Sequence, residues 1–472
     1  MKMLAIALAL LAQVETTPPP PAAPREPQLP KPAEKTLANG LRVIVVQKPG
    51  VPIVATRLLI KTGSEADPAN LAGLADGTAS LLTKGTKTRS AVQIARGVEA
   101  LGATLESGGG WDSSFVALGV MSSNLPKALV YVSDVVRNPV FANDEIERLR
   151  AQTLDSLQVA MHQPRALAGF VAARVVFGEG AYGHNVSGTR ESVKRIKRAD
   201  IVKFHRDYYH PNNAILIFGG DIAPQRAFAL AEQHFGAWKS EVPPTAAAPV
   251  ANATSKPRVV VIDMTEAGQA AVVVTRPGLR RVDPAYFIAQ VTNSILGGGY
   301  SSRLNEEIRI KRGLSYGAGS SFDLRRDVGP FSASAQTKNE SAAEVAGLIA
   351  DELNKLGKEP VADVELGPRK ATLIGNFGRS LESSASLVNR VAFLALYGLS
   401  LDEINRYISG IQSVTAQQVE QFAAGHLGAA DSSIIIVGDA KKFIDPLRQR
   451  FKDVEVIPSG ELDLNSPTLR KK

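Results

Sequence analysis

The chain has 472 residues, of which 44% are hydrophobic and 21% are charged. This length and apolar content exceed what one ordinary hydrophobic core needs, so we expect two or more domains. The 54 Lys and Arg residues outnumber the 46 Asp and Glu residues only slightly, and no long basic run is present, which argues against nucleic-acid binding. The sequence contains no cysteine, which excludes a disulfide framework.

The N-terminal segment has the order of a secretory signal peptide. Residues 1–13, MKMLAIALALLAQ, place a lysine before an apolar run that is too short to anchor a protein stably in a bilayer. Residues 16–32, TTPPPPAAPREPQLPKP, are rich in proline and predict an extended tether. We therefore assign residues 1–35 to a signal peptide and tether, and we expect export to the periplasm without stable membrane insertion.

Two pairs of segments indicate an internal duplication. Residues 41–69 align without a gap on residues 257–285, at an offset of 216 positions. Near the other end of each half, residues 196–222 match residues 414–440 at an offset of 218. Because both halves begin and end alike, the sequence predicts two tandem homologous domains.

The repeat divides the chain into an N-terminal domain at 36–240, a Pro- and Ala-rich linker at 241–257 and a C-terminal domain at 258–465. Alternating β-branched runs such as RVIVV and AILIF predict strands, whereas residues 144–162 and 341–357 have helical spacing. Strand pairs open each half and long helices follow. The expected fold class is α+β, with a mainly antiparallel sheet faced by helices in each domain.

Three segments carry a resemblance to a known family. They are KTGSEADPANLAGLADGTASLLTKGT at 61–86, YYHPNNAILIFGGDI at 208–222 and ILGGGYSSRLNEEIRIKRGLSYGAGSSF at 295–322. These blocks resemble the pitrilysin/insulinase family of zinc peptidases, and the resemblance extends over roughly residues 36–460. It implies that the duplicated chain forms one half of a clamshell.

The zinc motif of that family is degenerate here. Active members carry His-x-x-Glu-His on the first helix, because two histidines four residues apart share a helix face and the glutamate then acts as general base. At the histidine positions this chain has Asp76 and Ser80, at the glutamate position it has Ala79, and the distal glutamate falls at Ser156. The resemblance therefore implies no metal ligands and no cofactor in this chain, with zinc held by a partner.

A second pair of family residues is present. In the family an arginine and a tyrosine seven residues apart serve catalysis from a domain other than the zinc-binding one, and Arg309 and Tyr316 have that spacing. Residues 301–311 predict a helix, Gly313 ends it, and residues 315–322 alternate as a strand. Such a turn brings the arginine at the helix end beside the tyrosine at the strand start.

The chemistry of peptide hydrolysis explains why these two residue types are suitable. Negative charge develops on the scissile carbonyl oxygen, and a phenol hydroxyl and a guanidinium group fixed beforehand stabilise that charge. Without the resemblance, the favoured interpretation of Arg309 and Tyr316 is a solvated arginine and a packed tyrosine.

Two glycine runs are further candidates. Gly297, Gly298 and Gly299 lack the Gly-Lys-Ser/Thr ending of a phosphate loop. By resemblance to a non-catalytic family subunit whose glycine-rich loop handles substrate, we assign them to substrate binding, although a simple turn before a helix is the alternative. Residues 106–115, ESGGGWDSSF, lie where family members have a substrate-pairing edge strand, and three glycines weaken such a strand.

The expected protein is the zinc-lacking subunit of a heterodimeric metallopeptidase. Its expected partners are a homologous zinc-bearing chain and an unfolded peptide, with no nucleic acid. It is expected to be inactive alone. Two alternatives are a non-enzymatic peptide-binding or scaffolding module of the same fold and a peptidase that is active alone. The second of these is weakest, because no Ser/His/Asp or carboxylate constellation is apparent from spacing.

Overall fold

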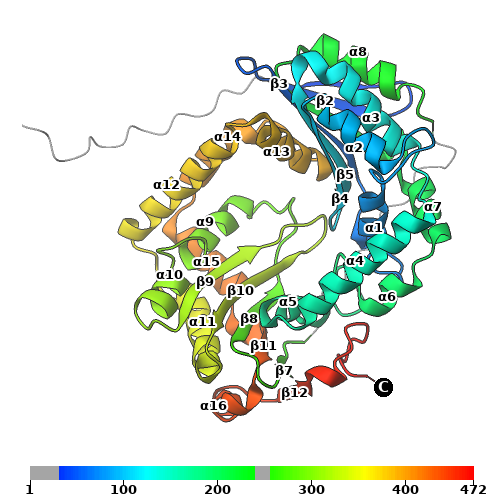
Figure 1. The fold of residues 1–472 in the computed structure, drawn as a ribbon. Coiled ribbons are helices and arrows are strands. Elements are labelled where there is room, and N and C mark those ends of the chain that lie inside the picture. The colour runs from blue at the N-terminus through cyan, green and yellow to red at the C-terminus, as the bar shows by residue number, and fades with distance from the viewer. Residues whose placement is uncertain (1–30, 240–255, 472) are drawn as a thin grey trace, which may run out of the picture.

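The computed structural model describes residues 31–239 and 256–471, which fold into two β-sheets with helices packed against them (Figure 1). The predicted signal peptide, nearly all of the tether and nearly all of the linker lie outside the described residues. The tether assignment at 1–35 overlaps the first strand, which begins at Ala33. No helix within the described ranges is both long enough and apolar enough to cross a membrane.

The elements of the first half, within residues 31–239, follow in chain order: β1 (Ala33–Thr36), β2 (Arg42–Gln47), β3 (Ile53–Ile60), α1 (Leu74–Leu81), α2 (Ala91–Glu99), β4 (Thr104–Gly109), β5 (Ser114–Met121), α3 (Leu125–Arg137), α4 (Asn143–Met161), α5 (Pro164–Phe177), α6 (Arg190–Arg195), α7 (Arg198–Tyr208), β6 (Ala214–Gly220) and α8 (Pro224–Phe235).

The elements of the second half, within residues 256–471, are β7 (Val259–Asp263), β8 (Ala270–Pro277), α9 (Tyr286–Leu296), α10 (Arg303–Asn305), the π-helical turn η4 (Glu306–Ile310), β9 (Ser315–Phe322), β10 (Pro330–Thr337), α11 (Ala342–Leu356), α12 (Asp363–Ser380), α13 (Ser384–Leu396), α14 (Glu403–Gln412), α15 (Ala416–His426), β11 (Ser433–Gly438), α16 (Ile444–Arg450) and β12 (Val454–Pro458). The two helices predicted at 144–162 and 341–357 are confirmed as α4 and α11.

The two sheets have equivalent strand orders. The first is β1-β2-β6-β3-β5-β4 and the second is β12-β7-β11-β8-β10-β9. The pairs β2–β6, β7–β11 and β7–β12 are parallel, and the other pairs within the described sheets are antiparallel. The predicted α+β fold, with two tandem domains and mainly antiparallel sheets, is confirmed.

The halves exchange one helix each. Helix α5 of the first half packs on β8 and β11 of the second sheet, and α13 of the second half packs on β3 and β6 of the first (Figure 1). Gly219 on β6 makes the second contact possible, because an added Cβ there would lie 2.5 Å from Val388 Cγ2 of α13. Each sheet therefore buries apolar surface against a helix from the other half, which couples the two halves energetically.

The C-terminal segment also crosses between the halves. Arg174 Nε on α5 donates a hydrogen bond of 2.9 Å to the Leu464 carbonyl. Thr189 Oγ1, just before α6, donates one of 2.8 Å to Asn465 Oδ1. Leu462 and Leu469 are buried in the same apolar cluster as α5. The end of the chain thus fastens α5 in place over the second sheet.

Candidate functional site

Arg309 and Tyr316 are brought together by the turn that the sequence predicts. Arg309 lies in η4, where the helix widens to π geometry, and the Lys311 N–H donates to the Glu306 carbonyl at 2.9 Å. Gly313 then adopts a φ of +63°, a conformation that glycine accepts without strain. The chain reverses there into β9, and Tyr316 is its second residue. π-helical turns of this kind occur frequently at functional sites.

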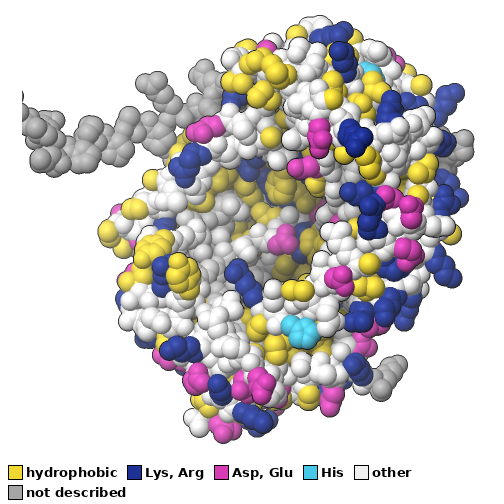
Figure 2. All heavy atoms as spheres, viewed as in Figure 1, with side chains coloured by type: hydrophobic (Ala, Val, Ile, Leu, Met, Phe, Trp, Pro, Cys, Tyr) yellow, Lys and Arg dark blue, Asp and Glu magenta, His cyan; other side chains and the backbone are white. Residues whose placement is uncertain are grey.

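Arg309 is held between two tyrosine rings. Its guanidinium carbon lies 4.9 Å from the centroid of Tyr316 and 4.8 Å from that of Tyr300, at cation–π distances. Tyr300 is not among the residues predicted from the sequence, although it follows the glycine run directly and is an aromatic residue in a polar turn. Figure 2 shows hydrophobic and basic side chains gathered on the surface in the region of α10.

These side chains do little for the fold itself. Tyr316 is 91% exposed and Tyr300 is 66% exposed. The side chains of Arg309 and Tyr316 form no hydrogen bond or ion pair with a described residue, so their donors are available to a ligand or partner. Contact with the two tyrosine rings restricts the Arg309 side chain. The Arg309 guanidinium and the Tyr316 hydroxyl therefore form a pre-oriented pair of hydrogen-bond donors.

The three glycines differ in their surroundings. Gly297 is buried, and an added Cβ would lie 2.2 Å from Ser320 N. Its carbonyl accepts the Ser320 N–H at 3.2 Å, so it holds the loop against β9. Gly298 and Gly299 are exposed, and only Gly299 has open space where a side chain would be. Gly297 thus has a packing role, whereas the backbone of Gly298 and Gly299 is accessible.

The outer edge of β9 is already hydrogen-bonded at its centre. The Ala318 N–H donates to Asn305 Oδ1 at 3.2 Å, and the Ser320 N–H donates to Gly297. Addition of a peptide strand along β9 would have to displace these bonds.

Strand β4, at the edge of the first sheet, is more open. In the hairpin, the Gly110 N–H donates to the Ser113 carbonyl. In an antiparallel pair, every second residue bonds to the partner strand and the residues between point their backbone groups outward. Counting back along β4 from Gly110, the backbone groups of Leu105 and Ser107 therefore point away from β5. A groove of about 430 Å³ lies beside this edge and is lined in part by α2 and Leu105. Despite its glycines, β4 therefore has the geometry to accept an extended chain.

Asp76, at the first histidine position of the motif, is engaged by the fold. Its carboxylate accepts the Ser187 hydroxyl at 3.1 Å and the Gly109 N–H at 3.4 Å, and burial raises its pKa. The start of α1 is held by Asp67, which accepts the N–H groups of Gly73 and Ala75 at 2.8 Å each. These carboxylates stabilise α1 and its contact with β4.

The distal position of the alignment, Ser156, lies on α4. Ser156 is exposed, and its hydroxyl donates to the Gln152 carbonyl of its own helix. Thr153, one turn earlier on α4, instead shares a cavity of about 50 Å³ with Asp76 and Ser80 of α1. Ser156 is therefore not part of this cavity, whereas Thr153 on the same helix is.

The residues at this place do not fit a zinc ion. Asp76 brings one carboxylate, Ser80 and Thr153 bring hydroxyls, and Ala79 is buried without a polar group. Zinc sites in proteins are built from nitrogen, sulfur and carboxylate ligands, usually three or more. No group of three or more His, Cys, Asp or Glu residues suited to a metal occurs in the described ranges.

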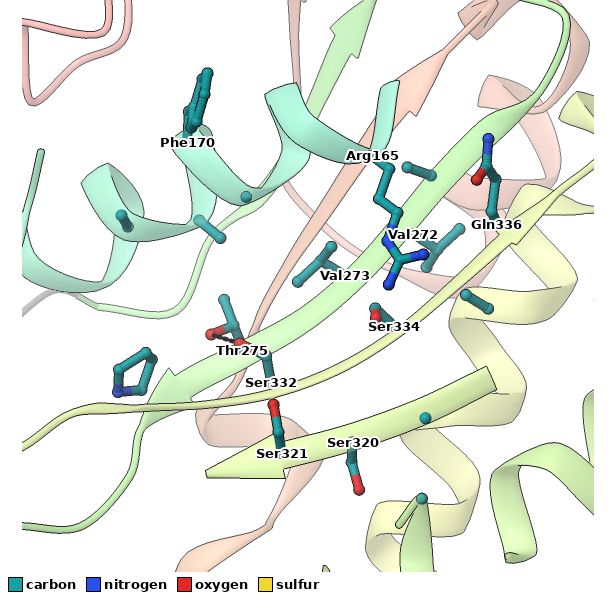
Figure 3. Close-up of a pocket in the computed structure, with 18 of the residues that line it drawn as sticks. Arg165, Phe170, Val272, Val273, Thr275, Ser320, Ser321, Ser332, Ser334 and Gln336 are labelled. Carbon is teal, nitrogen blue, oxygen red and sulfur yellow. Dashed lines mark hydrogen bonds between the residues drawn. The ribbon is translucent and has the colours of Figure 1, made fainter. Parts of the chain in front are cut away.

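A large cavity lies between the halves. It has a volume of about 760 Å³ and is bounded by α5 on one side and by β8, β9 and β10 on the other, and Tyr316 is one of its lining residues. Figure 2 shows the corresponding face hollowed at its centre. On β10 the buried residues Phe331 and Ala333 alternate with Ser332 and Ser334, so the serines line the cavity (Figure 3).

A polar network joins the halves behind this cavity. Arg326, on the loop between β9 and β10, donates to Glu65 Oε1 at 2.8 Å and to the Asp112 carbonyl at 2.9 Å. Asp112 Oδ2 accepts the Arg326 N–H at 2.7 Å and the Tyr397 hydroxyl at 2.9 Å. Burial raises the pKa of Glu65 to about 7, although Arg326 opposes the shift.

Comparison with known families assigns this fold to one class of protein, the peptidase-like chains of duplicated α+β architecture. A family model described as "Insulinase (Peptidase family M16)" matches residues 42–181, and one described as "Peptidase M16 inactive domain" matches residues 195–373. Together the two matches cover more than half of the chain. The chain therefore belongs to peptidase family M16, the insulinase family.

Individual proteins agree with this assignment. An uncharacterized zinc protease of Mycobacterium tuberculosis is 29% identical over 395 residues, which are 83% of this chain and 90% of that protein. The crystal structure of a peptidase M16 inactive domain from Pseudomonas fluorescens is 28% identical, with a TM-score of 0.81 over 86% of this chain and 98% of that chain. A protease from Helicobacter pylori is 22% identical and shares the fold, with a TM-score of 0.80. The superposed region is 87% of this chain and 100% of that chain.

Proposed function

We propose that this chain is the zinc-lacking subunit of a heterodimeric metallopeptidase, and that Arg309 and Tyr316 act on a peptide bound by a homologous zinc-bearing partner. The observation that carries the proposal is the exposed, pre-oriented arginine and tyrosine pair in a chain whose own zinc motif cannot hold zinc. The names of similar proteins, a zinc protease and an inactive domain, agree with a family that contains both kinds of chain.

The chemical role follows from the two donors. Peptide hydrolysis adds water to the carbonyl carbon, and negative charge develops on the carbonyl oxygen. The Tyr316 hydroxyl and the Arg309 guanidinium donate hydrogen bonds that are stronger to this charged oxygen than to the neutral carbonyl, so they lower the barrier. The water and the metal belong to the partner's site, and this chain contributes the donors and part of the peptide-binding surface.

Three surfaces have the geometry to bind the peptide. The backbone of Gly298 and Gly299 is exposed near Tyr300, the cavity extends from Tyr316 between the halves, and β4 presents an unpaired edge. An unfolded peptide fits such a surface, because extended backbone pairs with a strand edge and its side chains enter the cavity.

The test is reconstitution with the zinc-bearing homologue. Tyr316→Phe removes one hydroxyl and Arg309→Ala removes the guanidinium, so each is expected to lower turnover of an unstructured peptide by about a hundredfold while the complex still forms. Arg312→Ala is the matched control, because Arg312 lies on the same turn but pairs with Glu307. Gel filtration checks assembly in every case.

A second candidate is a non-enzymatic peptide-binding or scaffolding module. The open edge of β4 and the cavity are compatible with binding alone. Wild-type turnover in both variants of Arg309 and Tyr316, with assembly intact, would favour this candidate and reject the catalytic role.

We also propose that the mature protein is periplasmic, on the basis of the signal-like order of residues 1–13. Mass spectrometry of the native protein should find an N-terminus after the apolar run. An intact Met1 in a cytosolic fraction would contradict it.

A further inference from the structure

The cavity between the halves contains a cation that no carboxylate neutralises. Its charged or titratable lining residues, within the described part of the chain, are Arg165, Arg325, His184 and Tyr316, and none is an aspartate or a glutamate. Arg325 is paired with Asp323 at 2.5 Å and stacks on Trp111 at 4.0 Å. Arg165 has neither a hydrogen bond nor an ion pair with a described residue.

Arg165 does not stabilise the fold at its position. It lies in the first turn of α5, directly after Pro164, where the helix dipole disfavours a positive charge. Its side chain is exposed to the cavity and is not packed in the core. A role in ligand binding explains an arginine at this place better than a role in stability.

The wall opposite Arg165 carries spare hydroxyl groups. Figure 3 shows Arg165 reaching from α5 toward β8 and β10, with its guanidinium group near Val272 and Ser334. Thr275 and Ser332 bond to each other at 3.0 Å, whereas the hydroxyls of Ser334 and Ser321 have no side-chain partner in the described structure. Small hydroxyl side chains leave the space open and can donate hydrogen bonds to an anion.

We propose that this cavity binds a carboxylate of the peptide through Arg165, with Ser334 as a second donor. The inference rests on the proposed peptide-binding function and names its substrate class: segments that carry an acidic side chain or a free C-terminal carboxylate. An arginine fork donates two hydrogen bonds to a carboxylate, and such charge-assisted bonds are stronger than neutral ones. The same unpaired guanidinium group repels basic segments, so the cavity selects against them.

The test measures peptide binding to the full chain by fluorescence anisotropy. The probes are one unstructured peptide rich in Asp and Glu, its Asn and Gln counterpart, and both sequences with an amidated C-terminus. We expect the affinity for the acidic peptide to be at least about tenfold higher than the affinity for the neutral, amidated peptide. Loss of affinity on amidation alone identifies the C-terminal carboxylate, and loss on Asn and Gln replacement identifies acidic side chains.

The variants isolate Arg165. Arg165→Gln should abolish the preference for carboxylates, and Arg165→Lys should retain part of it, because the charge remains but the fork is lost. Arg226→Gln is the matched control: Arg226 also lies exposed in the first turn of a helix, α8, and is not part of the cavity lining. It changes the net charge equally and should leave binding unchanged.

Two results would overturn the inference: equal affinity for the acidic peptide and for the neutral, amidated peptide, or a carboxylate preference that survives Arg165→Gln. Absence of binding by every probe would overturn it as well. The proposed role of Arg309 and Tyr316 is judged separately by turnover of the reconstituted complex, so the two proposals fail in different experiments.

Discussion

Helix α1 and the segment from Gly297 to Tyr316 both carry polar residues at places that matter for catalysis in zinc peptidases of this family, but the fold uses them differently. On α1, Asp76 accepts hydrogen bonds from Ser187 and Gly109, and Ala79 is buried. In the other segment, Arg309 and Tyr316 are left without hydrogen-bond partners among the described residues.

This difference distinguishes residues that are retained for structure from residues that are retained for function. A polar group whose bonds are made within the chain contributes to stability, and its removal leaves buried partners unsatisfied. An exposed tyrosine with a spare hydroxyl contributes little to stability, so the fold itself does not require it. This criterion supports our proposal that α1 is retained for structure and that the segment around Arg309 is retained to bind a ligand or partner.

The largest effect is expected when metal binding is restored to α1. Asp76→His and Ser80→His together with Thr153→Glu place three ligands around the small cavity between α1 and α4. We expect about one zinc per chain after dialysis, against no stoichiometric zinc in the unmodified protein, as measured by elemental analysis.

The matched variant carries the same two histidines with Ser156→Glu. Because Ser156 is exposed and outside that cavity, this protein should retain much less zinc. Equal zinc content in the two variants would show that Thr153 does not occupy the distal position.

The next largest effect concerns Tyr300. If its ring orients Arg309, Tyr300→Ala should lower turnover of the reconstituted complex by about tenfold, whereas Tyr300→Phe should keep the stacking and the activity. The comparison of the two variants, measured with Arg309 unchanged, distinguishes orientation from a direct role of the Tyr300 hydroxyl. Equal losses in both would reject the orienting role.

A smaller effect is expected where the first half meets the second, at Glu65. Its pKa is raised from 4.5 to about 7 by burial, so its contribution to stability is full below pH 4.5 and is lost as the pH rises through 7. The variant Glu65→Gln has no carboxyl group to titrate at this place. Relative to that variant, the unmodified protein should lose on the order of 1 kcal/mol of its free energy of unfolding between pH 5 and pH 7.5.

Denaturant unfolding at the two pH values tests the role of Glu65. His205 produces the opposite slope, because burial lowers its pKa from 6.5 to about 4 and stability is lost as the pH falls through that range. His205 is present in both proteins, so the difference between them isolates Glu65. If the stability of the unmodified protein and that of Glu65→Gln change by the same amount between the two pH values, Glu65 is ionised at both.

The smallest effect is expected on α1 itself. Asp76→Asn keeps an oxygen that can accept the Gly109 N–H, and its amide N–H can donate to the Ser187 hydroxyl, so the free energy of unfolding should change by less than about 1 kcal/mol. Turnover of the reconstituted complex should be unaffected. A marked fall in turnover, with stability unchanged, would place α1 at the catalytic surface and end the distinction between the two regions.

Much of the fold could be predicted because duplication leaves its signal in the sequence. The offsets of 216 and 218 residues correspond to β2 with β7 and to β6 with β11, and these strands occupy equivalent positions in the two sheets. The exchange of α5 and α13 could not be predicted in this way. An apolar helix face shows that a surface must be buried, but not which sheet buries it.

The candidate site was predictable where it depends on local geometry. Gly313 and the change of period around it predict that Arg309 and Tyr316 lie on either side of one turn. Tyr300 and Arg165 were missed for different reasons. Tyr300 reaches Arg309 across a loop, and Arg165 faces strands more than a hundred residues away along the chain.

The sequence by itself determined the duplicated α+β architecture, the family blocks and the loss of the zinc ligands, because each depends on residue identity and spacing along the chain. Only the tertiary structure decided that Thr153 and not Ser156 lines the small cavity beside α1, that Gly297 packs on β9, and that Arg165 is unpaired in a shared cavity. These facts depend on which helix faces meet and which charges remain unpartnered once both halves are packed together, and no local pattern encodes that.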